Sequence, residues 1–364
     1  MRGLRRLTFT RFIAAMLVVI FHFGKDVWPF STNALSFLVH QGPSAVSYFY
    51  SLSGFVMAVA YPAIQNRPVD RQAFWVARFA RIYPAFVLAM LFAIALSTNT
   101  PQLQIWLPLL GLQAWSQSHL NYLNPPAWSI SVELVFYLLF PLLISAFCEK
   151  RIRSTRRLII LFWGGSQVVF SLIAAIAPMN QNFFRDFLFY NPVLHLNEFL
   201  LGVLIGSAYV QARLSGFWYS SPLKPLAVIV CLYALAILIG RERWPMWIQY
   251  TNGLLAPLFL WFIVALATAP VEYATWMTSK LAILLGESSY AIYIFQYPMR
   301  IAFTKYVEPM QALSSTAITY LYLAALILLS VLVHVAVEKP ARLWLRKKMA
   351  ANNPAVNSAQ AERT

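Results

Sequence analysis

The chain has 364 residues, of which 60% are hydrophobic, 16% aromatic and only 11% charged. Soluble globular proteins contain about 25% charged residues, and disordered proteins are poor in apolar and aromatic residues, so the composition excludes both classes. There are two cysteines and no cysteine–histidine cluster, so we expect neither a disulfide framework nor a metal site. The formal net charge of +16 would fit a nucleic-acid partner, unless its distribution along the chain has another cause.

Apolar segments long enough to cross a hydrocarbon core of about 30 Å recur along the chain. They predict an all-α polytopic integral membrane protein with about ten transmembrane helices, at 8–28, 44–64, 75–97, 128–148, 157–177, 190–211, 223–240, 250–269, 281–304 and 316–337. The first segment follows a group of arginines, as a signal peptide does, but no small-residue cleavage site follows it. We therefore expect it to be a retained span. The partly apolar segment 101–127 favours a re-entrant or interfacial helix.

Lysines and arginines are distributed very unequally between the two sides of this topology. Of the 28 basic residues, 22 fall on the side that holds both termini and 6 on the other. Positively charged loops stay in the cytoplasm, so both termini are predicted to be cytoplasmic. The asymmetry accounts for most of the +16 charge without nucleic acid. We expect a transmembrane domain over 1–345 and a disordered polar cytoplasmic tail over 346–364.

Arg11 and His22 are the first informative pair of polar residues in a predicted span. Eleven residues rotate a helix by about 1,100°, close to three full turns, so both side chains lie on one face about 16 Å apart. A phosphate held by Arg11 would then lie one extended cofactor arm away from a base at His22. The alternative is a boundary arginine together with a hydrogen-bonded core histidine, and the spacing alone favours neither.

Arg78 and Arg81 lie at i and i+3 and are therefore neighbours on one helix surface. Guanidinium groups suit phosphate oxygens, because they offer paired donors and keep their charge. Together with Arg11 they predict a cytoplasmic site for a multiply phosphorylated ligand. The alternative is an ordinary cluster of basic residues at the membrane surface, which we favour for Arg67 and Arg71.

Two prolines followed by Trp128 and Ser129 predict entry into a helix from the outer membrane interface. Ser129, Glu133 and Tyr137 follow one another at helical spacing and give that helix one polar face. Glu133 is expected at a depth comparable with that of His22, where a carboxylate would fix the tautomer of the imidazole and support general-base action. The alternative is a structural glutamate satisfied by backbone donors.

Three weaker features complete the polar residues of the predicted spans. Gly54, after Ser53, allows either close approach of a ligand or plain packing of small residues. His195 and Glu198, at i and i+3, are compatible with a structural pair, and His334 is interpreted as a helix-terminus feature. A polar stripe in the ninth span predicts either a cavity wall or an interhelical hydrogen-bond seam: Ser289, Tyr293, Gln296 and Arg300.

Taken together, these residues resemble the membrane acyltransferase-3 family, which O-acylates bacterial surface and exported glycans. The resemblance covers essentially the whole chain, and its motifs occur in family order: Arg11-x10-His22, Leu52-Ser53-Gly54-Phe55, Arg78-x2-Arg81, Trp128-Ser129-x3-Glu133, Glu198-Phe199-x2-Gly202, Gly286-x2-Ser289-Tyr290-x2-Tyr293 and Glu338-x-Pro340. One departure is Gln296, where many members have histidine, which argues against an ionisable group at this position.

The resemblance implies a ten-span enzyme of the bacterial inner membrane, similar to those that acetylate xanthan-like exopolysaccharides. Such an enzyme transfers an acetyl group from cytoplasmic acetyl-CoA, a substrate rather than a tightly bound cofactor, to a glycan hydroxyl on the outer side. Arg11, Arg78 and Arg81 would hold the CoA phosphates, and Ser53 and Gly54 would line the path of the donor.

The resemblance also implies that His22 is catalytic with Glu133 as its partner. Substrate binding would fall to a further set of residues: Trp128, Ser129, Tyr137, Glu198, Ser289, Tyr290 and Tyr293. Whether His22 acts as a general base or carries the acyl group is left open. The acceptor is open as well: lipopolysaccharide O-antigen, a peptidoglycan precursor or a small glycan are alternatives. A proton-coupled transporter is the alternative from another class of protein.

Overall fold

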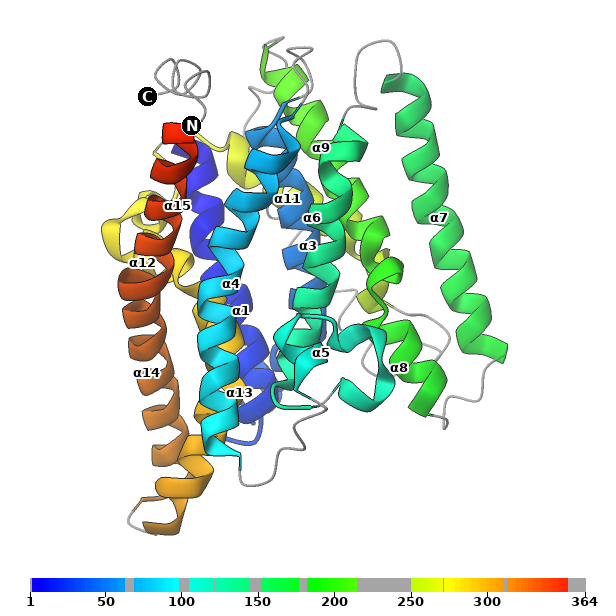
Figure 1. The fold of residues 1–364 in the computed structure, drawn as a ribbon. Helices are drawn as coiled ribbons and strands as arrows, with labels where there is room; N and C mark the ends of the chain where they lie inside the picture. The colour runs from blue at the N-terminus through cyan, green and yellow to red at the C-terminus, as the bar shows by residue number, and fades with distance from the viewer. Residues whose placement is uncertain are drawn as a thin grey trace.

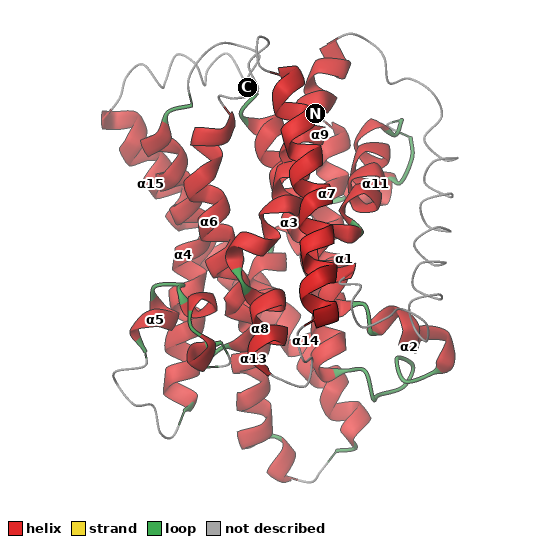
Figure 2. Ribbon diagram, turned by 90° about the vertical axis from the view of Figure 1, so that its right-hand side faces the viewer, coloured by secondary structure: helices red, strands yellow, loops and turns green. Residues whose placement is uncertain are grey.

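The computed structural model describes residues 2–62, 69–97, 105–120, 122–144, 152–176, 182–214, 250–270, 272–310 and 313–352. Within these ranges every regular element is helical and no strand occurs (Figures 1 and 2). The predicted all-α class is confirmed for this part of the chain.

The helices follow one another along the chain with mostly short connections. Their bounds are α1 Arg2–Phe23, α2 Asn33–Val39, α3 Gly42–Ala60, α4 Arg71–Leu96, α5 Trp106–Leu109, α6 Trp128–Leu143, α7 Ile152–Ile176, α8 Asn182–Tyr190, α9 Leu196–Leu214, α11 Ala256–Thr268, α12 Lys280–Glu287, α13 Ser289–Tyr306, α14 Ser315–Val333 and α15 Lys339–Asn352. The segment 101–127, for which a re-entrant or interfacial helix was one prediction, contains only α5 and three single 3-10 turns within its described part.

Membrane-spanning character is evident from length and composition. Six helical stretches are long and apolar enough to cross a membrane: Leu4–Phe23, Arg71–Leu96, Pro125–Leu143, Arg153–Ile176, Pro192–Ala212 and Ser315–Leu345. Helices α3, α11 and α13 occupy three further predicted spans, and the predicted span 223–240 lies outside the described residues. The chain is therefore a multispan membrane protein, while the number of about ten spans stays a prediction.

The start of α1 and the end of α15 lie at the same end of the bundle (Figure 1). This arrangement fits an even number of spans, and the cytoplasmic location of that end remains a prediction. Helix α15 continues to Asn352, so the beginning of the expected disordered tail is helical. The rest of that tail lies outside the described residues.

Side-chain caps fix where three of the helices begin. The carboxylate of Asp70 accepts a hydrogen bond from the first turn of α4, and the hydroxyls of Ser279 and Ser314 do the same for α12 and α14. Such a cap satisfies a backbone N–H that has no partner within the helix. The cap at Asp70 thereby sets the helical phase that carries Arg78 and Arg81.

A proline inside α6 creates a contact between α6 and α4. Pro141 has no N–H to offer the carbonyl of Tyr137 four residues earlier, which is left without its helical partner. The indole Nε1 of Trp75 in α4 donates to that carbonyl at 3.0 Å. Because a buried carbonyl must find a donor, this bond holds Tyr137 beside α4.

A carbonyl freed by a proline also joins α13 to the segment before α6. Pro298 frees the carbonyl of Ile294 in α13, and the side-chain amide of the buried Asn124 donates to it at 2.8 Å. Asn124 begins the Asn-Pro-Pro sequence that leads into α6. The first turn of α6 is thereby fixed against the middle of α13.

Helices α3 and α9 pack at unusually close range along a seam of glycines. A Cβ added to Gly54 would overlap the carbonyl oxygen of Phe199, and one added to Gly202 would overlap that of Ser51. Small residues permit such an approach of two helix backbones in a membrane protein. The seam leaves the neighbouring face of α3 free to line a cavity.

Arg6 is a structural arginine. Its buried guanidinium donates to the carbonyls of Leu266, Ala269 and Pro270, at and just after the end of α11. Cations stabilise the carbonyl end of a helix, so Arg6 ties α1 to α11. It differs in this from the arginines described next.

Candidate active site

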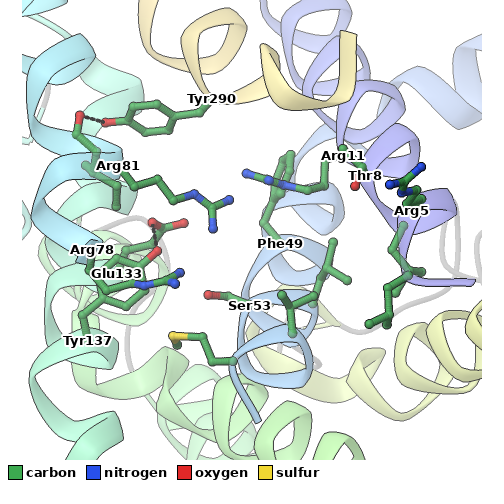
Figure 3. A pocket seen from close by; sticks show the side chains of 16 residues that line it. Arg5, Thr8, Arg11, Phe49, Ser53, Arg78, Arg81, Glu133, Tyr137 and Tyr290 are labelled. Atoms are coloured by element: carbon green, nitrogen blue, oxygen red, sulfur yellow. Dashed lines mark hydrogen bonds between the residues drawn. The ribbon is translucent and has the colours of Figure 1, made fainter. Parts of the chain in front are cut away.

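A cavity of about 460 Å³ lies between α1, α3, α4, α6 and α13. This volume falls in the range of about 300–1,000 Å³ that is typical of small-molecule sites. The polar side chains on its wall are Arg5, Thr8 and Arg11 of α1, Ser53 of α3, Arg78 and Arg81 of α4, Glu133 and Tyr137 of α6, and Tyr290 of α13 (Figure 3). Three arginines from two separate sequence motifs, Arg11 from one and Arg78 and Arg81 from the other, thus lie around one space, which we call the arginine cavity.

Positive charge dominates the arginine cavity, because four arginines and one glutamate line it. The guanidinium carbon of Arg78 lies 5.5 Å from the ring centre of Phe74 and 5.9 Å from that of Tyr137, and its buried Nε has no hydrogen-bond partner within the described residues. None of the ion pairs in that part of the chain involves Arg11, Arg78 or Arg81. Unpaired guanidinium groups around a cavity favour an anionic ligand.

Glu133 belongs to the arginine cavity and accepts a hydrogen bond of 2.8 Å from the hydroxyl of Tyr137. It therefore shares the depth of Arg11, about 16 Å along α1 from His22, and the expected equal depth of Glu133 and His22 is corrected. The segment before α6 is held against the middle of α13 by Asn124, and Trp128 at the start of α6 is buried. The helix α6 begins inside the protein, and five further residues carry Glu133 to the arginines.

Two smaller cavities adjoin the arginine cavity and share Arg11 and Tyr290 with it. The first, of about 160 Å³, is also lined by Thr8, Arg81, Glu287, Glu338 and Arg342. The second, of about 30 Å³, includes, besides Tyr290, three further residues that the sequence assigned to substrate binding: Ser129, Ser289 and Tyr293. The predicted residues Tyr290 and Tyr137 line the arginine cavity itself.

His22 lies at the other end of the polar face of α1, and its partner is Gln296. The Nδ1 atom of His22 lies 3.0 Å from Oε1 of Gln296, whose amide nitrogen donates to the carbonyl oxygen of Tyr293 at 2.8 Å. The polar stripe of α13 is therefore a cavity wall at Tyr293 and a hydrogen-bond seam at Gln296. Its last member, Arg300, forms an ion pair of 2.7 Å with Glu308.

Two predicted substrate-binding residues lie away from the three cavities. Trp128 packs against aromatic rings, with the ring of His195 5.5 Å away. Glu198 is fully buried, accepts a hydrogen bond of 2.8 Å from Ser47 and lies 3.7 Å from His195. These contacts favour the alternative interpretation of His195 and Glu198 as a structural pair.

Ser53 and Gly54, both predicted to line the donor path, point in different directions. Ser53 lines the arginine cavity, whereas the missing side chain of Gly54 faces the backbone of α9. This geometry favours packing as the role of Gly54.

The sequence did not reveal a cluster of ionisable residues beside the arginine cavity. The buried ring of His334 lies 2.9 Å from Glu338 through Nδ1 and 3.3 Å from Glu287 through Nε2. The motif Glu338-x-Pro340 was the available signal, but it carried no spacing that relates it to Glu287. The hydrogen bond of Gln296 to His22 was missed in the same way, because it joins residues 274 positions apart.

The described residues thus form a multispan helical membrane protein with an arginine-lined cavity, and His22 lies farther along α1, the helix that carries Arg11. The acyltransferase domain of the acyltransferase-3 family matches residues 4–335. The chain belongs to this family, and it is an acyltransferase. This membership decides against the transporter alternative.

The relatives of the chain include proteins named as acyltransferases. It is 28% identical to acyltransferase MdmB of Streptomyces mycarofaciens, over 96% of this chain and 94% of that protein. It is 22% identical to O-acetyltransferase OatA of Staphylococcus aureus, over 81% of this chain and 50% of that protein, so it spans about half the length of OatA. No solved structure matches the chain.

Proposed function

We propose that the protein is an O-acetyltransferase of the bacterial inner membrane. It takes an acetyl group from cytoplasmic acetyl-CoA and transfers it to a sugar hydroxyl of an exopolysaccharide or lipid-linked glycan on the periplasmic side. The observation that carries this proposal is the arginine cavity, in which Arg11, Arg78 and Arg81 have no carboxylate in an ion pair within the described residues.

Coenzyme A fits this cavity chemically because its phosphate groups require several cations that are not already neutralised. Guanidinium groups bind phosphate oxygens through charge-assisted hydrogen bonds. The first half of α1, from Leu4 to Arg11, lines the cavity, and the sequence places most of its basic residues on the side of the predicted membrane at which α1 begins. A donor bound with its phosphates there would extend its thioester along α1 toward His22.

His22 is the proposed catalytic group, and Glu133 remains a candidate for assistance from the donor side. In direct transfer, His22 removes the proton from the acceptor hydroxyl, and the oxygen attacks the thioester carbonyl. The carbon–sulfur bond then breaks, and the coenzyme leaves as a thiol with the proton from His22. In the covalent route the imidazole itself attacks the thioester, and the acceptor hydroxyl then takes the acyl group from it. Both routes require an unprotonated ring nitrogen.

The acceptor would approach from the opposite end of the bundle. Ser129 and Tyr293 line the small cavity that shares Arg11, Glu133 and Tyr290 with the arginine cavity, so they are proposed to contact the substrates there. The names of the relatives support acyl transfer and do not identify this acceptor.

The donor site is tested by measuring the affinity of the purified protein in lipid nanodiscs for acetyl-CoA. Arg78→Ala and Arg81→Ala are each expected to weaken binding about tenfold or more, since a hydrogen bond to a charged group contributes about 1.5–3 kcal/mol. Arg71→Ala is the matched control, because Arg71 is exposed on the same helix and does not line the cavity. Unchanged affinity in both cavity variants would refute the donor site.

The acceptor is tested by mass spectrometry of surface glycans from cells with and without the protein. An acetyl group that disappears from the exopolysaccharide on deletion supports the proposal. Its disappearance from O-antigen, a peptidoglycan precursor or a small glycan would identify one of the alternative acceptors instead.

A further inference from the structure

The side chain of Gln296 has only one orientation that satisfies both of its contacts. One end of its amide faces the carbonyl oxygen of Tyr293 at 2.8 Å, and the other faces Nδ1 of His22 at 3.0 Å. A carbonyl oxygen can only accept, so the amide NH₂ must face Tyr293 and Oε1 must face His22. Gln296 is fully buried, which leaves water no access to replace either bond.

The fixed orientation of Gln296 determines where the neutral ring of His22 carries its proton. An acceptor at Oε1 requires that Nδ1 be the protonated nitrogen, and the remaining lone pair is then on Nε2. His22 is exposed, and no hydrogen bond to its Nε2 is found within the described part of the chain. The nitrogen that can accept a proton or attack a thioester is thus the open one.

We propose that Gln296 is a positioning residue that holds His22 in the Nδ1-protonated tautomer and presents Nε2 to the substrates. The inference rests on the proposed function, since it assumes that His22 acts in acyl transfer. An amide in this place has a consequence that a carboxylate would not have. It orients the ring without a negative charge that would favour the protonated imidazole, so His22 stays available as a base.

The other groups around His22 do not supply such a negative charge. On the same segment Lys25, with a positive charge, is the charged group that acts on His22, whereas the adjacent Asp26 is exposed and does not act on it. On α13, Arg300 is paired with Glu308. From α14, the hydroxyl of Tyr322 donates to the backbone carbonyl of Gln296 at 2.9 Å, so that this residue is fixed through its backbone as well.

The test uses the full-length protein in nanodiscs and records acetyl transfer against pH for substitutions of nearly equal volume. Gln296→Glu keeps the acceptor and adds a charge. The acidic limb of the pH profile is expected to move up by about one pH unit or more, because a carboxylate within about 4–6 Å favours the charged ring. Gln296→Met removes the acceptor and is expected to lower kcat about tenfold without weakening acetyl-CoA binding.

Tyr322→Phe is the matched control, because it removes a hydrogen bond to the backbone of Gln296 and leaves the contact with His22 intact. A purely structural role of this region predicts reduced amounts of folded protein in all three variants and no movement of the acidic limb. An unmoved limb in Gln296→Glu, with folded protein present, would overturn the inference.

His22→Ala separates this inference from the proposed function. If His22→Ala retains full activity, the catalytic assignment itself fails. If His22→Ala is inactive and the limb of Gln296→Glu does not move, only the role of Gln296 fails.

Discussion

The two ends of the polar face of α1 differ in how their functional side chains are satisfied. At Arg11, cations outnumber anions around an open cavity, and none of the ion pairs in the described residues involves the three motif arginines. At His22, a neutral and fully buried amide fixes the ring through one hydrogen bond. A site that binds an anion needs cations that are not already paired with carboxylates. A histidine that acts as a base needs a hydrogen bond that fixes one ring nitrogen, and its other ring nitrogen must be free to accept a proton.

The strongest test of this comparison is His22→Ala. We expect acyl transfer to fall by about 10²–10⁴-fold, the usual contribution of a positioned acid–base group. Binding of acetyl-CoA should stay unchanged, because the arginine cavity lies about 16 Å away. Transfer is measured with labelled acetyl-CoA, and binding by calorimetry on the same preparation. Loss of binding in this variant would mean that the two ends of α1 are one site.

A second test concerns the packing that keeps α3 in place beside the arginine cavity. Gly54→Ala is expected to destabilise the protein by about 1–3 kcal/mol, since the added methyl group overlaps the backbone of α9. The measurement is thermal unfolding in detergent. Gly164→Ala in α7 is the control, because no atom lies within 4 Å of its added Cβ. That change should stabilise the helix by about 0.5–1 kcal/mol. If Gly54→Ala keeps full stability and loses only donor binding, Gly54 contacts the donor after all.

The smallest effect is expected for Glu133→Gln, which tests whether Glu133 of α6 acts together with the arginines near Arg11 or together with His22 at the other end of α1. Its contact with Tyr137 and its place among the arginines predict a change of a few-fold in the KM for acetyl-CoA, since the variant alters one hydrogen bond. The acidic limb of the pH profile should not move. Movement of that limb would instead support Glu133 as the partner of His22, as the resemblance to the family implied.

Much of the arginine cavity was predictable from sequence because its signals are local. The spacing of Arg78 and Arg81 places them on one helix surface, and the arginine count on each side of the spans assigned them to the same end as Arg11. The depth of Glu133 was not predictable in this way. It depends on how the segment before α6 folds against α13, where Asn124 donates to the carbonyl of Ile294.

The sequence by itself determined the class of the protein, six membrane-spanning stretches within the described residues and the family, because hydrophobic segment length and motif order are properties of the chain. Only the tertiary structure decided which polar groups meet. It paired His22 with Gln296, turned Gly54 toward α9 and gathered the arginines around one cavity. The physical reason is that spacing fixes the face of a helix on which a residue lies, whereas the packing of distant helices decides what that face contacts.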